Sequence, residues 1–387
     1  MSRVLFVQYT NPAGYPPLEH SSRILAGQGC SVCFLGIDVR EADDFRFPPH
    51  PGIQVRQMSY CPPGWRQKIH FLFYCVWVLV WMLSWRPRWI YASDLFSCPI
   101  SLLLSWVSGV RVVYHEHDAP GPASSPFMRF VLWTRRKLAR RADFCLVPNE
   151  ERARLFMVET GAVEVLRPWN CPSRDEVLRV PRLIHGTGEL SVLYHGSLSP
   201  GRLPKALFQA VAMLPVPVRL RVIGYETVGH RGYRLELERL AEDLGIAGRV
   251  EFLGALRTRA EVLEWCGNSD VGLALMPVRN PSHNERNMAG ASNKAFDCLA
   301  CGMPLLVSDL PEWRSMFVDP GYGLACDPRD PSSIAYALQW FVDHRKEVRE
   351  MGDRGRLRTL EEWNYDVQFA PISGRLVGAA ALEGSAA

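Results

Sequence analysis

The sequence has little excess charge, no tandem repeat and no apolar run long enough to span a membrane. Its 44 lysine and arginine residues against 40 aspartate and glutamate residues leave a net charge of +4. Because there is no dense basic stripe, we expect no nucleic acid partner. The most apolar segment, residues 71–85, falls short of the ~20 residues that a spanning helix needs. With 48% hydrophobic and 22% charged residues, the composition is that of a soluble globular protein.

Disulfides, a secretory leader and a metal centre are also not expected. The eleven cysteines are odd in number and irregularly spaced, and residues 1–10 are typical of a strand rather than a signal peptide. Both features favour a reduced, cytoplasmic compartment. Two C-x-x-C spacings occur, Cys30/Cys33 and Cys298/Cys301. The first pair lies in a predicted strand and points to opposite faces, and the second lies among apolar neighbours, so we interpret both as packing residues.

Strand and helix patterns alternate through the whole chain, which predicts an α/β fold with parallel, doubly wound sheets. In the first half, the predicted strands are residues 4–8, 31–35, 89–92, 110–114 and 144–147, and the helices are 18–26, 71–85, 100–107 and 127–141. In the second half, the strands are 192–194, 220–223, 250–253, 271–275 and 305–307, and the helices are 204–213, 233–244, 259–266, 294–300 and 332–342.

A proline-rich stretch, residues 168–189, separates the two halves and favours a linker. We therefore predict two Rossmann-like domains, 1–175 and 176–362, which face a cleft, the usual place for a ligand. A helix over 363–378 is expected to cross back to the first domain, and 379–387 to be a flexible tail. Ligands of such sheets bind beyond the carboxyl ends of the strands.

Two loops at strand ends of the second domain favour an anionic ligand. Residues 196–202 offer small residues before a helix, where backbone N–H groups attract anions, and Arg202 adds a cation. Residues 280–292 are polar and lead into a helix that carries Lys294 and, one turn in, Asp297. Either loop alone is equally explained as a turn or a helix start; together they favour a diphosphate.

Residues 292–304, SNKAFDCLACGMP, resemble the donor-binding segment of glycosyltransferase family 4. Residues 249–254, 269–273 and 363–365 are also similar to family segments. The likeness covers roughly residues 1–370 and is stronger in the second half. It implies the GT-B fold and transfer of a sugar, with retention of configuration, from a UDP-, GDP- or ADP-sugar without a bound metal or other cofactor.

The resemblance also assigns a donor site, with two departures from the family pattern. Asp297 stands for the family carboxylate that holds the ribose, but Ala289 replaces its partner eight residues earlier. Ser197 replaces a family arginine, and Arg202 stands for a lysine. The residues expected to bind the donor are Gly14, Gly196, Ser197, Gly201, Arg202, Gly224, Gly290, Ala291, Ser292, Asn293, Lys294 and Asp297.

In the first domain, residues 114–118, YHEHD, resemble a family segment whose histidine lies near the donor sugar. This places His117 at the reaction centre, with Arg202 and Lys294 as the other catalytic residues. Tyr15, Asp94 and Glu150 follow strand ends and are assigned to the acceptor side. A metal site in residues 115–118, or a purely structural His117, are the alternatives.

Trp77, Trp81 and Trp85 share one helix face. Phe127, Phe130, Val131 and Trp133 lie beside the basic residues Arg135, Arg136, Lys137, Arg140 and Arg141. Aromatic and basic residues together favour peripheral contact with an anionic membrane surface; a buried core helix is the alternative. The acceptor is then expected to be lipid-linked, as in cell-surface polysaccharide or glycolipid synthesis. Two other functions fit the fold, a nucleotide-sugar epimerase and a non-catalytic sugar-nucleotide-binding partner, and the missing carboxylate at Ala289 favours the latter.

Overall fold

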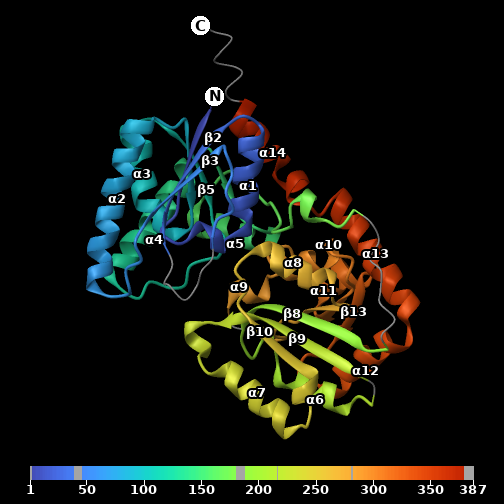
Figure 1. Cartoon of the computed structure of the whole chain (residues 1–387). Helices are drawn as coiled ribbons and strands as arrows, with labels where there is room; N and C mark the ends of the chain where they lie inside the picture. The colour runs from blue at the N-terminus through green and yellow to red at the C-terminus, as the bar shows by residue number, and fades with distance from the viewer. Residues whose placement is uncertain (1, 39–45, 180–187, 216, 280–281, 379–387) are drawn as a thin grey trace. The chain divides into compact units, whose positions relative to one another are not determined.

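The computed structural model describes residues 2–38, 46–179, 188–215, 217–279 and 282–378, and the chain divides into two compact units (Figure 1). The first unit is Met1–Asn170 with Tyr365–Ala387, and the second is Cys171–Asn364. The boundaries expected from sequence, after residues 175 and 362, differ from these by a few residues. The tail predicted over 379–387 lies outside the described residues.

In the first unit, the described residues form a parallel sheet in the order β3-β2-β1-β4-β5-β6-β7, as the alternation predicts. Its strands are β1 (Arg3–Val7), β2 (Ser31–Ile37), β3 (Ile53–Met58), β4 (Trp89–Ser93), β5 (Arg111–His115), β6 (Phe144–Leu146) and β7 (Val165–Leu166). The order turns at β1 and β4, and ligands of open α/β sheets bind at such a point.

Helices cover both faces of this sheet because successive strand residues point to opposite sides. Leu5 and Val7 pack beneath α2 (Trp65–Trp85), α3 (Cys98–Val107), α4 (Pro126–Arg141) and α5 (Glu150–Thr160). Val4 and Phe6 pack beneath α1 (Pro16–Gly27) and α14 (Tyr365–Gly378). The last helix, red in Figure 1, lies against α1, which confirms the expected return of the chain end to the first domain.

The second unit has a smaller parallel sheet of the same kind, in the order β10-β9-β8-β11-β12-β13. Its strands are β8 (Leu190–Leu198), β9 (Val218–Glu226), β10 (Val250–Gly254), β11 (Val271–Ala274), β12 (Leu305–Ser308) and β13 (Gly323–Cys326). Its helices are α6 (Lys205–Met213), α7 (Tyr233–Asp243), α8 (Arg259–Gly267), α9 (His283–Arg286), α10 (Asn293–Ala300), α11 (Pro311–Trp313), α12 (Pro331–Asp343) and α13 (Arg345–Glu361).

The strands and α-helices absent from the sequence prediction are β3, α5, β7, α9, α11, β13 and α13. Strand β3, with the sequence IQVRQM, lies at a sheet edge and exposes much of its length, so it lacks the apolar run of an inner strand. Helix α2 also begins earlier than expected, at Trp65. Gly64 before it has φ 146, and Arg86 after it is left-handed and precedes Pro87, so both ends are set by local backbone geometry.

Candidate functional site

At the end of β8 the backbone requires glycine at two positions. Gly196 has φ +121, and a Cβ there would lie 2.3 Å from Cε of Lys294. Gly224, opposite it on β9, has φ +157, and its Cβ would lie 1.8 Å from the Gly196 oxygen. Gly196 and Ser197 therefore belong to the strand, whereas the sequence placed them in the following loop. The lysine stem occupies the space beside Gly196, and the Gly196 backbone occupies the space beside Gly224.

Lys294 is the second residue of α10 and is only 7% exposed. Its Nζ donates to the Tyr194 hydroxyl at 3.2 Å and lies 4.7 Å from the centre of that ring. Burial, followed by the charge of Arg202, lowers the pKa of Lys294 well below its usual value. An anion bound beside this amine would offset both effects and favour its charged form.

Arg202 lies in the turn after β8 and keeps 22% of its side chain exposed. One guanidinium nitrogen donates to Oγ of Ser197 at 3.1 Å, and another lies 3.6 Å from Oε1 of Glu285. A Cβ on the neighbouring Gly201 would lie 3.3 Å from Pro277. The guanidinium thus has exposed donors near the end of β8, although it is also paired with a carboxylate.

The loop before α10 differs from the expectation that its N–H groups cradle a phosphate. Gly290 has φ +76, and the N–H groups of Ala291 and Ser292 both donate to the Met288 oxygen at 2.9 Å. They close a turn instead of pointing at a ligand. Within the described residues, Ser292 makes no side-chain capping bond at the start of α10. The N–H groups that open the helix, from Asn293 on, are therefore the donors suited to an anion.

Asp297 is 2% exposed and bonded to an arginine that sequence reasoning missed. Arg259, the first residue of α8, donates to Oδ1 at 2.6 Å and to Oδ2 at 3.2 Å. The same guanidinium is bonded to Glu176, at 2.6 and 3.2 Å. Both oxygens expected to hold the ribose already accept a bond from Arg259, so a ribose would have to use their remaining lone pairs or displace the guanidinium.

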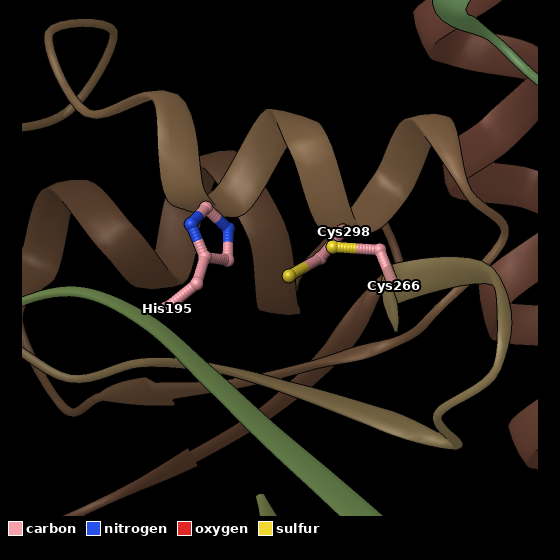
Figure 2. Close-up of side chains that lie close together, drawn as sticks. All are labelled: His195, Cys266 and Cys298. Carbon is pink, nitrogen blue, oxygen red and sulfur yellow. The ribbon is translucent and has the colours of Figure 1, made fainter. Parts of the chain in front are cut away.

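Beside Asp297 lies a cluster of soft donors that no local sequence pattern indicated. His195 of β8, Cys266 of α8 and Cys298 of α10 place their ligand atoms within 4.8 Å of one another (Figure 2). The buried position of Cys298 and Cys301 agrees with the packing expected for that pair. All eleven cysteines lie in the described part of the chain and are free thiols.

In the first unit, Asp94 directly follows β4 and has a strained backbone conformation, with φ 60 and ψ 175. Non-glycine residues rarely adopt this region, at a cost of order 1–3 kcal/mol. Its N–H donates to the His115 oxygen at 2.9 Å, and its oxygen accepts from Oγ of Ser97 at 2.6 Å. The carboxylate accepts from the His117 N–H at 3.2 Å. Burial, with the nearby Asp118 charge, raises the pKa of Asp94 to about 7.

His117 lies beside Asp94 and is held in the neutral form. Its Nε2 is 3.1 Å from Oγ of Ser93, and its ring centre is 3.9 Å from that of His115 and 5.0 Å from that of Tyr15. Burial lowers the pKa of His117 to about 4. Three of the predicted residues, Tyr15, Asp94 and His117, are therefore brought together at the carboxyl ends of β4 and β5.

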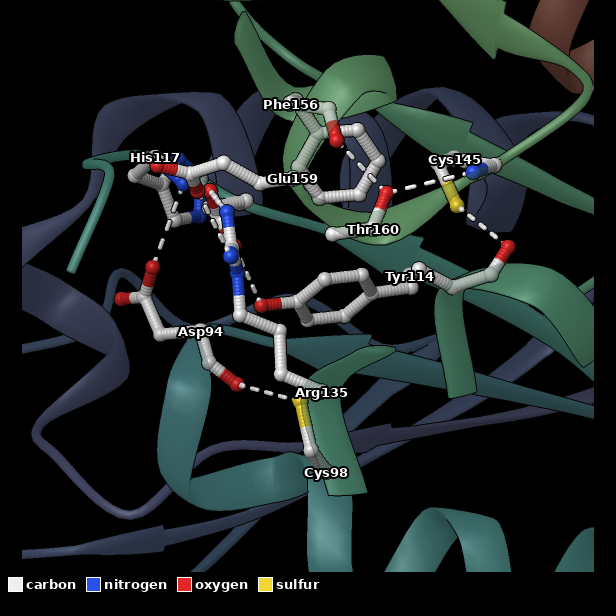
Figure 3. A network of polar contacts seen from close by, with 12 residues as sticks. Asp94, Cys98, Tyr114, His117, Arg135, Cys145, Phe156, Glu159 and Thr160 are labelled. Carbon is white, nitrogen blue, oxygen red and sulfur yellow. Dashed lines mark hydrogen bonds and ion pairs between the residues drawn. The ribbon is translucent and has the colours of Figure 1, made fainter. Parts of the chain in front are cut away.

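Glu116 forms a buried ion pair with Arg135, which Figure 3 shows beside Tyr114. Arg135 donates to its two carboxylate oxygens at 2.6 and 2.7 Å, and the Tyr114 hydroxyl donates at 2.7 Å. Arg135 also bonds to Glu159 at 2.9 Å. The structure thus gives no support to a metal set in residues 115–118. The expectation that Arg135 faces a lipid surface is wrong, because the guanidinium is buried against Glu116.

The other two predicted residues of the first unit lie in exposed positions. Gly14 ends the short turn Pro12–Gly14, and a Cβ added to it would meet no described atom within 4 Å. Glu150 is the first residue of α5, and its ion-pair partner among the described residues is Arg167, at 2.7 Å. It follows the N-cap Asn149, a position where the helix dipole favours a carboxylate.

Two family profiles match the chain. The profile of the glycosyl transferases group 1 matches residues 181–358, and that of the glycosyl transferase 4-like domain matches residues 18–169. The first match contains Gly196, Lys294 and Asp297, and the second contains Asp94 and His117. Each profile therefore covers most of one structural unit, together with the candidate residues at its strand ends.

Curated relatives carry one activity. The D-inositol 3-phosphate glycosyltransferase of Gordonia bronchialis is 23% identical over 378 residues, which is 94% of this chain and 76% of that protein. That of Xylanimonas cellulosilytica is 31% identical over 147 residues, 38% of this chain and only 32% of that relative. The likeness to the second protein is thus confined to about a third of its length.

Solved structures share the fold over the whole chain. The sucrose-phosphate synthase of Thermosynechococcus elongatus has a TM-score of 0.74 at 16% identity and covers 100% of both chains. Anabaena HepE, solved in complex with UDP and glucose, has a TM-score of 0.71 at 16% identity and covers 98% of this chain and 100% of that one. At this identity the likeness shows the fold, which confirms the expected GT-B architecture.

Proposed function

Since the chain is a nucleotide-sugar glycosyltransferase that belongs to the group 1, family 4 enzymes, we propose that it transfers a hexose from a UDP-sugar to the hydroxyl of a lipid-linked acceptor, with retention of configuration. The observation that carries this proposal is the buried amine of Lys294, which fills the space left by Gly196. A buried cation at the end of a parallel strand is suited to a diphosphate.

The chemistry that we assign to the second unit is stabilisation of the leaving group. As the bond between sugar and phosphate breaks, negative charge grows on the nucleoside diphosphate. Lys294, Arg202 and the first N–H groups of α10 are fixed donors for that charge, and such preorganised electrostatics supply the largest part of many rate accelerations. Amine and guanidinium groups serve this purpose without a divalent cation.

Two considerations support UDP over other nucleotides. Anabaena HepE, with the same fold, has been solved with UDP and glucose and with UDP-glucose. These two structures have TM-scores of 0.71 and 0.69 and cover 98% of this chain. The departures at Ser197 and Ala289 leave the diphosphate donors Arg202 and Lys294 in place. We therefore rank UDP-sugars first among the donors to test.

The acceptor hydroxyl is assigned to Tyr15, Asp94 and His117 of the first unit. The raised pKa of Asp94, about 7, and the lowered pKa of His117, about 4, leave both groups able to accept a hydrogen bond near neutral pH. Strained backbone at Asp94 supports a functional role, since such geometry clusters at active sites.

Contact with a membrane surface is supported by the exposed side of α2. By length and composition alone, α2 is the one described helix that could cross a membrane. Four of its residues, Phe71, Tyr74, Val78 and Met82, are nevertheless buried in the core of the unit, which favours lying on the surface over spanning. The large apolar residues that this helix exposes include Trp65, Leu72, Phe73, Val76, Val80 and Leu83.

We assign the membrane contact to these exposed residues and not to the tryptophan face that the sequence indicated. Trp77, Trp81 and Trp85 are partly buried against the core. Trp106 of α3 and Trp133 of α4 are also exposed, and α3 packs against both α2 and α4. Arg129, Arg136 and Lys137 are exposed on α4 and suit anionic headgroups. We propose that the enzyme works at the cytoplasmic face of a membrane, in cell-surface polysaccharide or glycolipid synthesis.

The donor is tested by thermal shift with UDP-, GDP-, ADP- and dTDP-sugars, because a ligand that binds only the folded state raises Tm. We expect the largest rise with UDP-sugars and none in Lys294→Met. Turnover is then measured with extracts of membrane lipid as acceptor. Conversion of the donor to an epimer without an acceptor would favour an epimerase. Binding without any turnover would favour a non-catalytic partner.

The membrane proposal is tested by flotation with anionic and neutral vesicles at low and high salt. We expect flotation with anionic vesicles at low salt, weakened by Phe73→Asp in α2. Tyr336→Asp is the matched control, because Tyr336 is an exposed aromatic residue of α12 in the other unit. A wild-type protein that never floats, or two variants that lose flotation equally, would contradict the proposal.

A further inference from the structure

The soft donors beside Asp297 come from three separate elements of the second unit. His195 belongs to β8, Cys266 to the end of α8, and Cys298 to α10. Both thiols are fully buried, and His195 is 8% exposed. The three ligand atoms lie within 4.8 Å of one another (Figure 2). Packing alone brings thiols into apolar cores, but it does not require an imidazole to face them.

The imidazole of His195 is oriented as a ligand would be. Its ring hydrogen-bonds to the backbone of Lys294, whereas the buried Nε2 has no hydrogen-bond partner among the described residues. Figure 2 shows one ring nitrogen turned toward the sulfur of Cys298. Histidines that bind metals commonly use their other nitrogen to bond a backbone or carboxylate group, which fixes the ring. A buried, unsatisfied nitrogen of this kind requires an explanation.

A fourth soft donor adjoins the cluster. The Cys301 thiol interacts with that of Cys266 and is buried, but it donates to the Leu263 oxygen at 3.5 Å and lies outside the group of three. If it turned inward, the four residues would form a Cys₃His set, one of the common ligand sets of structural zinc. Zn–S bonds of about 2.3 Å and Zn–N bonds of about 2.0 Å place ligands under about 4 Å apart, so a contraction of roughly 1 Å would bring His195, Cys266 and Cys298 to that spacing. Asp297, whose Oδ2 is 3.8 Å from His195 Nε2, adds negative charge nearby.

We propose that His195, Cys266, Cys298 and Cys301 form a closed structural site for one soft divalent cation of the zinc class. The site would bind β8, α8 and α10 to one another directly behind Gly196 and Lys294. It would have no catalytic part, since buried ligands leave no open position for substrate. This inference does not depend on the proposed sugar transfer, and it departs from the expectation that the C-x-x-C pair only packs. Cys266 and His195 are distant in sequence, which is why the spacing did not reveal the set.

The test is metal content in the full chain, produced without a histidine tag in zinc-supplemented medium and kept reduced. We expect about one zinc per chain in the wild type, in line with a single four-ligand site. Cys298→Ser and His195→Asn should lose it. Cys326→Ser is the matched control, because Cys326 is also buried in the same unit but does not belong to the cluster.

A second measurement keeps the test decisive if a cluster variant does not fold. Wild-type protein refilled with Co²⁺ under reducing conditions should show the charge-transfer and d–d absorption of tetrahedral thiolate ligation, as Cys326→Ser should. Zinc removal should also lower the Tm of the wild type, since metal binding is coupled to folding. The proposal would be overturned if the wild type held no more zinc than Cys298→Ser, or if the cobalt spectrum of the wild type lacked thiolate bands.

Discussion

The two units place different chemistry at the carboxyl ends of otherwise similar parallel sheets. In the second unit, cations gather there: Lys294 behind Gly196, and Arg202 in the adjacent turn. In the first unit, the corresponding edge carries Asp94, whose pKa is raised to about 7, and His117, whose pKa is lowered to about 4. Burial acts on both sets by disfavouring the charged form, but its consequence differs. It leaves the lysine in need of an anion, and it leaves the carboxyl and the imidazole suited to a neutral hydroxyl.

The difference indicates that two sheets of the same kind are suited to different ligands. A diphosphate is doubly charged and recognised through fixed cations and helix N-termini, whereas an acceptor hydroxyl is recognised through hydrogen bonds alone. The family-like sequence segments are clearer in the second unit, to which we assign the donor. Substitutions at the strand ends of one sheet only can test this difference between the two units.

Replacing Lys294 by methionine should have the largest effect on rate. The change keeps the stem that fills the space at Gly196 but removes the charge, and loss of one preorganised transition-state donor costs about 10²–10³ in kcat. Because burial disfavours the charged amine, Tm should not fall. Lys205→Met, at an exposed lysine of α6 paired with Glu236, is the control. Steady-state kinetics with near-normal kcat in Lys294→Met would remove the amine from the donor site.

Arg202→Ala should lower kcat by about 100-fold, the lower end of the range for one lost donor. The interaction strengthens as charge grows on the leaving group, so kcat should fall more than the donor KM rises. The matched control is Arg234→Ala, an exposed arginine that pairs with Glu238 on α7. An equal loss in both variants, measured with Tm as the folding control, would point to general surface charge.

Asp297 and Glu176 share Arg259 as a partner, which permits a sharp comparison on the donor side. Asp297→Asn should raise the donor KM by about tenfold with little change in kcat, because a hydrogen bond to a charged group contributes about 1.5–3 kcal/mol and ribose binding is uniform in ground and transition states. Glu176→Gln should leave KM nearly unchanged. If both variants raise KM alike, Asp297 acts only by holding Arg259.

Asp94 should give the first unit a signature in pH. Its pKa of about 7 predicts that kcat/KM for the acceptor rises with pH through that value as the carboxylate forms. Because the folded state retains a proton that the unfolded state loses above 3.8, this group stabilises the fold at low pH and the contribution disappears as pH rises to about 7. Asp94→Asn should flatten the rate profile and raise Tm at pH 8 relative to the wild type.

Much of the fold was predictable because the inner strands are continuous apolar runs separated by helices of regular period. Edge strand β3, IQVRQM, lacked that signal. Faces were harder to assign: periodicity groups Trp77, Trp81 and Trp85 on one face of α2, but only the packed structure shows that this face meets the core. The partners Arg135–Glu116 and Arg259–Asp297 depend on which helices become neighbours in space, so no spacing along the chain could have indicated them.

The smallest expected effect is that of chelation on rate. Amine and guanidinium groups already face the proposed diphosphate, so turnover should persist in excess EDTA without any added Mg²⁺ or Mn²⁺, ions that prefer oxygen ligands. The proposed thiolate site is buried and of a different class, so zinc content is measured in the same samples before and after treatment. Rate lost with zinc retained, and restored by Mg²⁺ or Mn²⁺ alone, would show that a divalent cation takes the part assigned here to Lys294 and Arg202. Rate lost in proportion to zinc would instead tie activity to the integrity of the second unit, leaving the comparison between the two strand-end sites unchanged.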